Sequence, residues 1–577
     1  MANNAPHEKC GSLFLPTSQK ELKIRNWDYV DVIIFTGDAY IDHPAFGAAV
    51  IGRTLEKEGY RVAIVPQPNW RDDLRDFKKL GKPRLFFGVT SGCMDSMVNH
   101  YTANKRLRSN DAYTPDGKAG FRPNYATTTY AKILKQLFPD TPVILGGIEA
   151  SLRRLTHYDY WNDSLRPSIL AESGADLLVY GMGERPIVEI AKRICEGGNL
   201  YDIPQTAFYT ANTNNSTNRA VALHSYEECC RNSEKFAVNF CTIESESNKV
   251  QAFTLMEPVG DGNIVVNPPY PTMSEHEIDN SFDLPYTRLP HPRYSDKHIP
   301  AYEAIKFSVN IHRGCFGGCS FCTISAHQGK FIASRSEQSI VKEATHITKM
   351  AGFKGYLSDL GGPSANMYTM KGKNSSLCVK CKRNSCIYPT VCNNLNTDHA
   401  RLLDLYRSVQ NISGIKKVFI GSGIRYDLFL GKNGFLNSTS EKYFTTLLRN
   451  HVSGRLKVAP EHTEAHVLNL MRKPSFDLFE KLKALFDQQN SHEKLRQQLI
   501  PYFISSHPGC SEHDMSLLAK KLKHLRLNPE QVQDFTPTPM TYASVMFYTG
   551  MDPYKKEKVF IARSKEAKLR QKNYFFA

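Results

Sequence analysis

Three cysteines in one short stretch are the residues of this chain best suited to chemistry. Cys315, Cys319 and Cys322 form a C-x3-C-x2-C run that supplies three thiolates to one loop. A structural metal site normally closes with a fourth protein ligand, whereas a site with three protein ligands leaves a position for a substrate or cofactor. Gly317 and Gly318 allow the loop to fold round a bulky inorganic core. The spacing predicts an iron–sulfur site with one open iron; half of a zinc knuckle is the alternative.

This triplet resembles the signature of the radical SAM superfamily. The resemblance implies a 4Fe-4S cluster whose open iron binds S-adenosylmethionine (SAM). It also implies reductive cleavage of SAM to methionine and a 5'-deoxyadenosyl radical, with the electron supplied by a donor such as flavodoxin or ferredoxin. We therefore expect an enzyme.

A second group of cysteines lies in an expected insertion over residues 363–397. Its pattern is C-x2-C-x4-C-x5-C, formed by Cys378, Cys381, Cys386 and Cys392. Half of the chain's 14 cysteines lie between Cys315 and Cys392, and the first residues lack the pattern of an export signal. In a reducing compartment such clustering favours metal ligation over disulfides. We expect zinc or a second iron–sulfur cluster here, with four free thiols as the alternative, and a cytoplasmic location.

The second half of the chain alternates strand and helix patterns. Six strand–helix units that share one sheet curve into a partial barrel with its chemistry at the carboxyl ends of the strands. The cysteine triplet follows the first of these strands. The expected strands are 305–311, 355–358, 417–420, 456–458, 501–504 and 531–535, and the expected helices are 337–351, 398–408, 441–451, 476–489 and 514–525.

The first half alternates in the same way and predicts a doubly wound parallel sheet. Its loops at Gly37-Asp38, Ser91-Gly92-Cys93, Gly146-Gly147 and 181–184 are expected to line one edge. The expected strands are 30–36, 61–65, 84–89, 142–145 and 176–180, and the expected helices are 45–58, 125–137 and 186–195. Residues 206–300 are rich in turn residues and proline, and we interpret them as an extended connector that includes some strands of unassigned order.

Taken whole, the chain resembles the YgiQ-type radical SAM family, whose reaction is unassigned. The matching segments are 36–47, 146–154, 267–271 and 534–539. The fold this implies is α/β, an N-terminal doubly wound parallel sheet followed by a radical SAM partial (β/α)6 barrel. Gly361 and Gly362 resemble the turn that receives the SAM amino group, with Pro363 where a Glu is common, and Ser422 and Arg425 resemble the segment that meets the ribose or carboxylate.

The N-terminal half also resembles the cobalamin-binding domains that precede some radical SAM cores. The lower-ligand motif of those domains, D-x-H-x-x-G, is altered here, because His43 follows Asp42 directly. A lone histidine near a helix start is more often a structural residue than a cobalt ligand. We do not expect cobalamin, and favour substrate or partner docking for this half.

The positive charge of the chain does not by itself identify a binding partner. The net charge is +16, and residues 555–572 carry eight Lys or Arg against two Glu. A solvated helix face is the plain interpretation of this tail, and contact with RNA or the ribosome is the other. No stretch is apolar and long enough to cross a bilayer, so no membrane partner is expected.

The prediction is a radical SAM enzyme acting on RNA, a ribosomal component or a small metabolite; a non-catalytic, metal-stabilised nucleic-acid-binding protein is the alternative. No acid–base residue is assigned: His327, Asp359, Glu461 and His462 lie near strand ends but suit capping equally well. The expected parts are an extension over 1–25, an α/β domain over 26–205, the connector over 206–300, the radical SAM core over 301–554 and a basic tail over 555–577.

Overall fold

The computed structural model describes residues 13–211, 220–527, 529–530 and 532–576. Parts of the predicted extension (1–12), connector (212–219), last strand (Gln531) and tail (Ala577) lie outside the described residues. The chain forms two compact units, each described here by itself. Unit 1 comprises Met1–Asn239, Gln251–Pro271 and Asn280–Lys306, and unit 2 comprises Phe240–Val250, Thr272–Asp279 and Phe307–Ala577.

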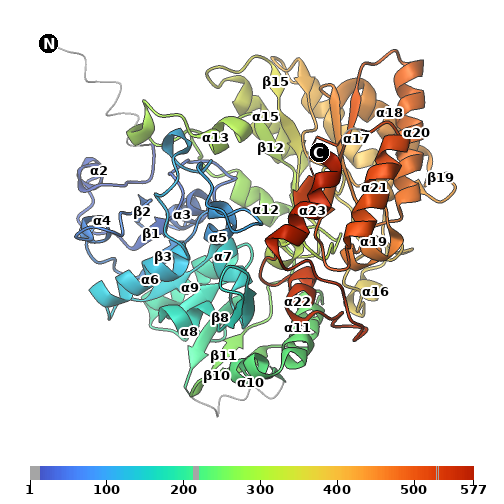
Figure 1. The fold of residues 1–577 in the computed structure, drawn as a ribbon. Coiled ribbons are helices and arrows are strands. Elements are labelled where there is room, and N and C mark those ends of the chain that lie inside the picture. The colour runs from blue at the N-terminus through green and yellow to red at the C-terminus, as the bar shows by residue number, and fades with distance from the viewer. Residues whose placement is uncertain (1–12, 212–219, 528, 531, 577) are drawn as a thin grey trace. The chain divides into compact units, whose positions relative to one another are not determined.

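Unit 1 is built on a sheet whose first five strands are parallel (Figure 1). Their order is β2-β1-β3-β4-β7, so the order reverses between β1 and β3, where ligands bind in open α/β sheets. These strands are β1 (Val32–Thr36), β2 (Val62–Pro66), β3 (Phe86–Thr90), β4 (Val143–Leu145) and β7 (Leu177–Val179). The helices of this part are α2 (Gln19–Ile24), α3 (Gly47–Lys57), α4 (Arg75–Lys78), α5 (Ser96–His100), α6 (Ala126–Leu137), α7 (Gly147–Leu152), α8 (Ile169–Ser173), α9 (Glu184–Glu196) and α13 (Pro300–Ile305).

Helices cover both faces of this sheet. Ile34 of β1 shares one apolar core with α3 and α9. The next residue, Phe35, faces the other way and stacks on Phe77, which contacts Tyr130 of α6. The doubly wound α/β sheet predicted from the apolar runs is therefore confirmed.

The stretch interpreted as an extended connector carries further strands of the same sheet. β8 (Thr206–Thr210) joins antiparallel to β7, and β11 (Gly262–Val266) and β10 (Leu255–Val259) follow as a hairpin. β9 (Val221–Ala222) closes the edge in parallel with β10. The structure thus gives an order to the strands of this stretch, whose short runs carry little periodicity in the sequence.

Unit 2 contains all six predicted strands, and neighbours pair in parallel in chain order. The second strand is interrupted and forms β15 and β16, and an isolated bridge between Ile424 and Val458 joins the third strand to the fourth. This is the partial (β/α)6 barrel expected from the sequence. The pairs are β12 (Ser308–Asn310) with β16 (Asp359–Gly361), β15 (Tyr356–Leu357) with β17 (Lys417–Val418), and β20 (Arg455–Glu461) with β21 (Gln498–Ser505), which in turn pairs with β22 (Val532–Asp534).

The helices of unit 2 flank these strands and enclose one large apolar core (Figure 1, yellow to red). They are α14 (Ile324–Gln328), α15 (Glu337–Thr348), α16 (Ser375–Val379), α17 (Ala400–Gln410), α18 (Ser438–Thr446), α19 (Ala465–Met471), α20 (Phe476–His492), α21 (Glu512–His524), α22 (Tyr542–Thr549) and α23 (Lys565–Phe576). The remaining helices are α10 (Tyr226–Arg231), α11 (Ser233–Ser247) and α12 (Glu275–Phe282). Across the described ranges, we find no helix whose length and apolar character would let it cross a bilayer.

Short hairpins and single helical turns complete the described structure. The hairpins are β5 (His157–Asp159) with β6 (Ser164–Arg166), β13 (His312–Arg313) with β14 (Ala333–Ser334), and β18 (Leu430–Gly431) with β19 (Gly434–Phe435). The turns are η1 (Pro115–Gly117), η2 (Pro292–Tyr294), η3 (Tyr426–Leu428) and η4 (Leu447–His451).

Candidate functional site

The cysteine loop lies at the carboxyl end of the first barrel strand. β12 ends at Asn310, and Cys315, Cys319 and Cys322 follow. Burial raises the pKa of Cys315 to about 11 and that of Cys322 to about 12, and the charge of Cys319 adds to both rises. The three sulfurs therefore lie within electrostatic range of one another. A metal that binds here must displace their protons.

The cysteines in the described part of the chain form no disulfide, and this includes both predicted metal-binding groups. Among the same residues, no group of three or more Cys, His, Asp or Glu side chains is arranged so that it could hold a single metal ion. In a four-iron cluster each thiolate binds a different iron, so the sulfurs do not have to converge on one point. The donor set at Cys315, Cys319 and Cys322 thus fits a cluster of this type.

Hydrogen bonds from distant segments fix the cysteine loop. Ser320 donates its N–H to Met471 (3.1 Å), and its carbonyl accepts from the N–H of Ala543 (2.9 Å). The Ser320 hydroxyl lies 2.9 Å from Nε2 of His507, whose Nδ1 lies 2.8 Å from the Pro508 carbonyl. Because a carbonyl only accepts, Nδ1 carries the proton and Nε2 accepts from Ser320. Burial lowers the pKa of His507 to about 3, so this histidine is a neutral anchor of the loop.

Arg425 lies against the cysteine loop. Its Nη1 donates to Sγ of Cys319 at 3.3 Å, while Nε and Nη2 donate to the two carboxylate oxygens of Asp427 at 3.0 and 2.6 Å. A guanidinium beside a sulfur favours the thiolate form that binds metal. The structure therefore brings Arg425 to the predicted cluster, and its contact with a SAM carboxylate stays a prediction.

The loops after the second and third strands meet next to the cysteine loop. Oδ1 of Asp359 accepts from the backbone N–H groups of Gly421 (2.9 Å) and Ser422 (3.2 Å), and the Ser422 hydroxyl donates to its other oxygen. A Cβ atom at Gly361 would lie 2.9 Å from the Ser422 hydroxyl oxygen. The four residues predicted to contact SAM thus come from adjoining loops, and Asp359 is a structural link between them.

His312 is a residue that the sequence interpretation missed. Its ring is fully buried and packs against Gly362, where a Cβ atom would lie 2.5 Å from the ring carbon Cε1. Within the described residues neither ring nitrogen has a hydrogen-bond partner, and burial lowers the pKa of His312 to about 3. In the sequence, only its position between the first barrel strand and the cysteine triplet could have indicated that His312 belongs to the site.

Of the four acid–base candidates, Glu461 stands out. It is buried, adopts a left-handed φ of +69°, and lies 3.5 Å from Nζ of Lys473. Burial raises its pKa. Nδ1 of His462, by contrast, accepts a hydrogen bond from the N–H of Glu464 at 3.1 Å. Asp359 is held by its hydrogen bonds to Gly421 and Ser422. His327 lies in the last turn of α14.

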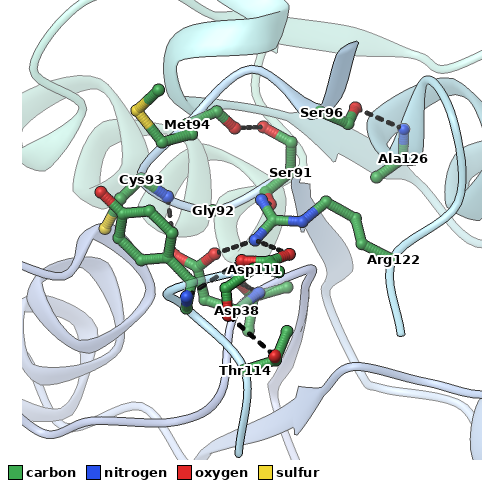
Figure 2. Close-up of polar contacts among 12 residues, drawn as sticks. Asp38, Ser91, Gly92, Cys93, Met94, Ser96, Asp111, Thr114, Arg122 and Ala126 are labelled. Carbon is green, nitrogen blue, oxygen red and sulfur yellow. Dashed lines mark hydrogen bonds and ion pairs between the residues drawn. The ribbon is translucent and has the colours of Figure 1, made fainter. Parts of the chain in front are cut away.

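At the carboxyl ends of β1 and β3 in unit 1, loop residues are joined by a buried network of polar contacts (Figure 2). Arg122 is fully buried and donates to Asp38 (2.7 Å), to Asp111 (3.4 Å) and to the carbonyl of Ser91 (2.6 Å). The second oxygen of Asp38 accepts from the N–H of Cys93 at 2.7 Å. The predicted loops do meet at this edge, where an internal ion pair occupies the position at which such sheets bind ligands.

His43 is held in a way that does not suit a lower cobalt ligand. Its Nδ1 accepts from the N–H of Ala45 at 3.1 Å, which leaves the proton on Nε2, the atom that would bind the metal. Asp42 pairs instead with Arg53, at 2.6 and 3.0 Å. The expectation that cobalamin is not bound stays a prediction.

With this geometry established, comparison with known proteins identifies the family. The family model described as "Radical SAM N-terminal" matches residues 14–308, and one described as a domain of unknown function matches 530–575. "UPF0313 protein" from Bacteroides thetaiotaomicron is 61% identical, with 98% of this chain and 94% of that protein covered. The "UPF0313 protein" from Porphyromonas gingivalis is 60% identical, with 98% of this chain and 90% of that protein covered.

Two solved structures align with this chain at much lower identity. The radical SAM methyltransferase TsrM from Kitasatospora setae aligns with a TM-score of 0.47 and 14% identity, covering 89% of this chain and 75% of that one. The cobalamin-dependent SAM radical enzyme OxsB aligns with a TM-score of 0.49 and 10% identity, covering 87% and 53%. Similarities this loose carry no conclusion about the ligands of this chain.

In this chain a doubly wound sheet is followed by a parallel partial barrel, and three cysteines come after the first barrel strand. This combination defines a protein of the radical SAM class. More narrowly, the chain belongs to the UPF0313 family, the YgiQ-type radical SAM proteins.

Proposed function

We propose that this protein is an enzyme that cleaves SAM reductively at a 4Fe-4S cluster held by Cys315, Cys319 and Cys322. The observation that carries the proposal is a three-thiol loop at the carboxyl end of the first strand of a parallel series, the end at which barrels carry their chemistry. When bound, the cluster would pass one electron from an external donor to SAM, and the C5'–S bond would break to give methionine and a 5'-deoxyadenosyl radical.

The chain's own residues are suited to hold and orient these partners. Ser320 and its contacts keep the cysteine loop in one place, and Arg425 donates to Sγ of Cys319. Gly361 and Gly362 present backbone without side chains beside this loop, where the SAM amino group is proposed to bind. Ser422 and Arg425 are proposed to receive the ribose or the carboxylate.

For the substrate, part of the basic tail packs within unit 2. Arg570 pairs with Glu512 (3.0 Å), Lys572 lies 3.4 Å from Asp534, and the buried Lys568 lies over the Phe547 ring. The other five cations of the tail are exposed and are proposed as contacts for RNA: Lys555, Lys556, Lys558, Arg563 and Lys565. Binding of tRNA or ribosomal RNA that weakens steeply with salt would still favour RNA over a small metabolite.

The test of the proposal is anaerobic turnover. The protein is reconstituted with iron and sulfide, mixed with SAM and a flavodoxin- or ferredoxin-type reductant, and assayed for 5'-deoxyadenosine. We expect the product from the unaltered chain and from Cys195→Ala, an exposed cysteine of unit 1, and none from Cys319→Ala. A chain that binds zinc tightly and yields no product would favour the non-catalytic alternative, and product from Cys319→Ala would refute the ligand assignment.

A further inference from the structure

The four cysteines of the insertion lie in a turn-rich loop that folds onto the cysteine loop of the barrel. Cys378 is in the short helix α16, and Cys381 follows it in a turn closed by an N–H···O=C bond of 3.1 Å between them. Cys386 and Cys392 are joined in the same way, at 2.8 Å. Backbone hydrogen bonds thus join the four cysteines in two pairs.

Two of these sulfurs already accept hydrogen bonds from N–H groups. The N–H of Arg383 donates to Sγ of Cys381 at 3.4 Å, and the side-chain amide of Asn394 donates to Sγ of Cys378 at 3.4 Å. The barrel loop has the same type of contact, because the N–H of Gly317 donates to Sγ of Cys315 at 3.4 Å. In both loops the N–H belongs to the residue two positions after the cysteine. N–H donors of this kind stabilise metal-bound thiolates and tune the metal.

The surroundings also suit a negatively charged centre. Lys330 is almost fully buried and donates to the carbonyl of Arg383, two residues after Cys381. Cys386 and Cys392 both pack against one apolar cluster that includes Phe316 of the barrel loop. A buried lysine beside a cysteine cluster is costly unless an anion is present.

The insertion is fastened to the barrel loop at one place. The Ser385 hydroxyl lies 3.1 Å from the carbonyl of Phe316 and 2.7 Å from that of Gly317, and the N–H of Cys386 donates to the Phe316 carbonyl at 3.1 Å. Gly318, with φ +63°, approaches Ser385 so closely that a Cβ atom would lie 2.9 Å from the serine Cβ. Cys386 therefore lies next to the residue that follows Cys315.

From this arrangement we infer that Cys378, Cys381, Cys386 and Cys392 bind a second metal centre through four thiolates. An iron–sulfur cluster would bind the thiolates at separate irons, whereas zinc would draw them to one point by side-chain rotation, which half-buried thiols on an irregular loop permit. The inference goes beyond the proposed SAM cleavage and does not depend on it.

The experiment counts metal in a chain that lacks the first site. Cys315, Cys319 and Cys322 are all replaced by alanine, and bound iron, sulfide and zinc are measured after anaerobic reconstitution and, separately, after zinc addition. We expect about four irons with sulfide per chain or about one zinc per chain; either result supports the inference and tells the metals apart. Adding Cys381→Ser and Cys386→Ser should remove that metal, and the matched pair Cys195→Ser and Cys230→Ser should not.

The inference would be overturned if the triple-alanine chain retained no metal. It would also be overturned if the metal stayed bound after Cys381 and Cys386 were replaced. A second measurement needs no variant and so does not depend on correct folding of one. In the reconstituted, unaltered protein, the four insertion cysteines should resist alkylation until the metal is removed, while the exposed Cys195 and Cys230 react at once. Equal rates for all six would also overturn it.

Discussion

Replacing Gly362 with alanine tests whether the buried His312 ring and the glycine turn form one tightly packed unit. The added Cβ would lie 2.5 Å from Cε1, 2.7 Å from Nδ1 and 2.9 Å from Nε2 of His312. Real Cβ atoms do not approach this closely, and the ring has no exposed side toward which to move. Either the ring or the turn must therefore shift.

Overpacking of this kind costs about 1–3 kcal/mol of unfolding free energy. In a unit of this size that corresponds to a fall in Tm of about 2–4 °C for each kcal/mol. Gly423→Ala is the matched control, because it lies in the neighbouring loop and nothing would lie within 4 Å of its Cβ. Calorimetric unfolding of both variants measures the difference, and SAM cleavage by the reconstituted proteins shows whether the displaced turn also impairs the site.

The reasoning predicts a coupling as well as a loss. In a His312→Ala background the added methyl group finds space, so Gly362→Ala should cost less there, by about 0.5–3 kcal/mol. Equal Tm values for Gly362→Ala and Gly423→Ala, or the same cost of Gly362→Ala with and without the ring, would refute the claim that His312 packs against this turn.

Three further predictions concern charged groups. Arg425→Gln removes the cation beside Cys319 and should lower the reduction potential of the reconstituted cluster; an unchanged potential in a redox titration would exclude this contact as a tuning element. Arg122→Met leaves Asp38 and Asp111 buried without their counter-charge and should cost about 3–5 kcal/mol in urea unfolding. Burial raises the pKa of Asp38, so the cost should be larger at pH 8 than at pH 5, where protonation relieves this carboxylate. Burial raises the pKa of Glu257 from 4.5 to about 7, so the folded state keeps a proton that the unfolded state loses, and stability should fall by about 3 kcal/mol as pH rises across that window. Glu257→Gln should abolish this slope, and identical slopes in the two proteins would contradict the assignment.

The parts of the fold that could be predicted are those whose sequence pattern is local. The residues of β1, Val32–Thr36, are buried without a break, as expected of a parallel strand covered on both faces. The hairpin of β10 and β11 also has a local signal, a Gly260-Asp261 turn between two short runs, but nothing local indicates that it joins the sheet of unit 1 through β8.

Contacts between distant segments could not be predicted in the same way. Nothing near Ser320 indicates His507 as its partner, and nothing near Phe316 indicates Ser385. These pairs exist because the barrel brings loops from different strands to one end, and a single sequence records no such neighbours. The cysteine spacing therefore predicted candidate ligands, but not the groups that hold their loop in place.

The ion pair of Arg122 with Asp38 and Asp111 has a consequence for the folding of unit 1. In sheets of this order, a bound molecule usually supplies the charge that the strand ends and helix starts would otherwise lack. Here a loop side chain brings a positive charge to the two buried carboxylates as the chain folds. Neutralisation of these carboxylates is therefore part of the folding of unit 1 itself.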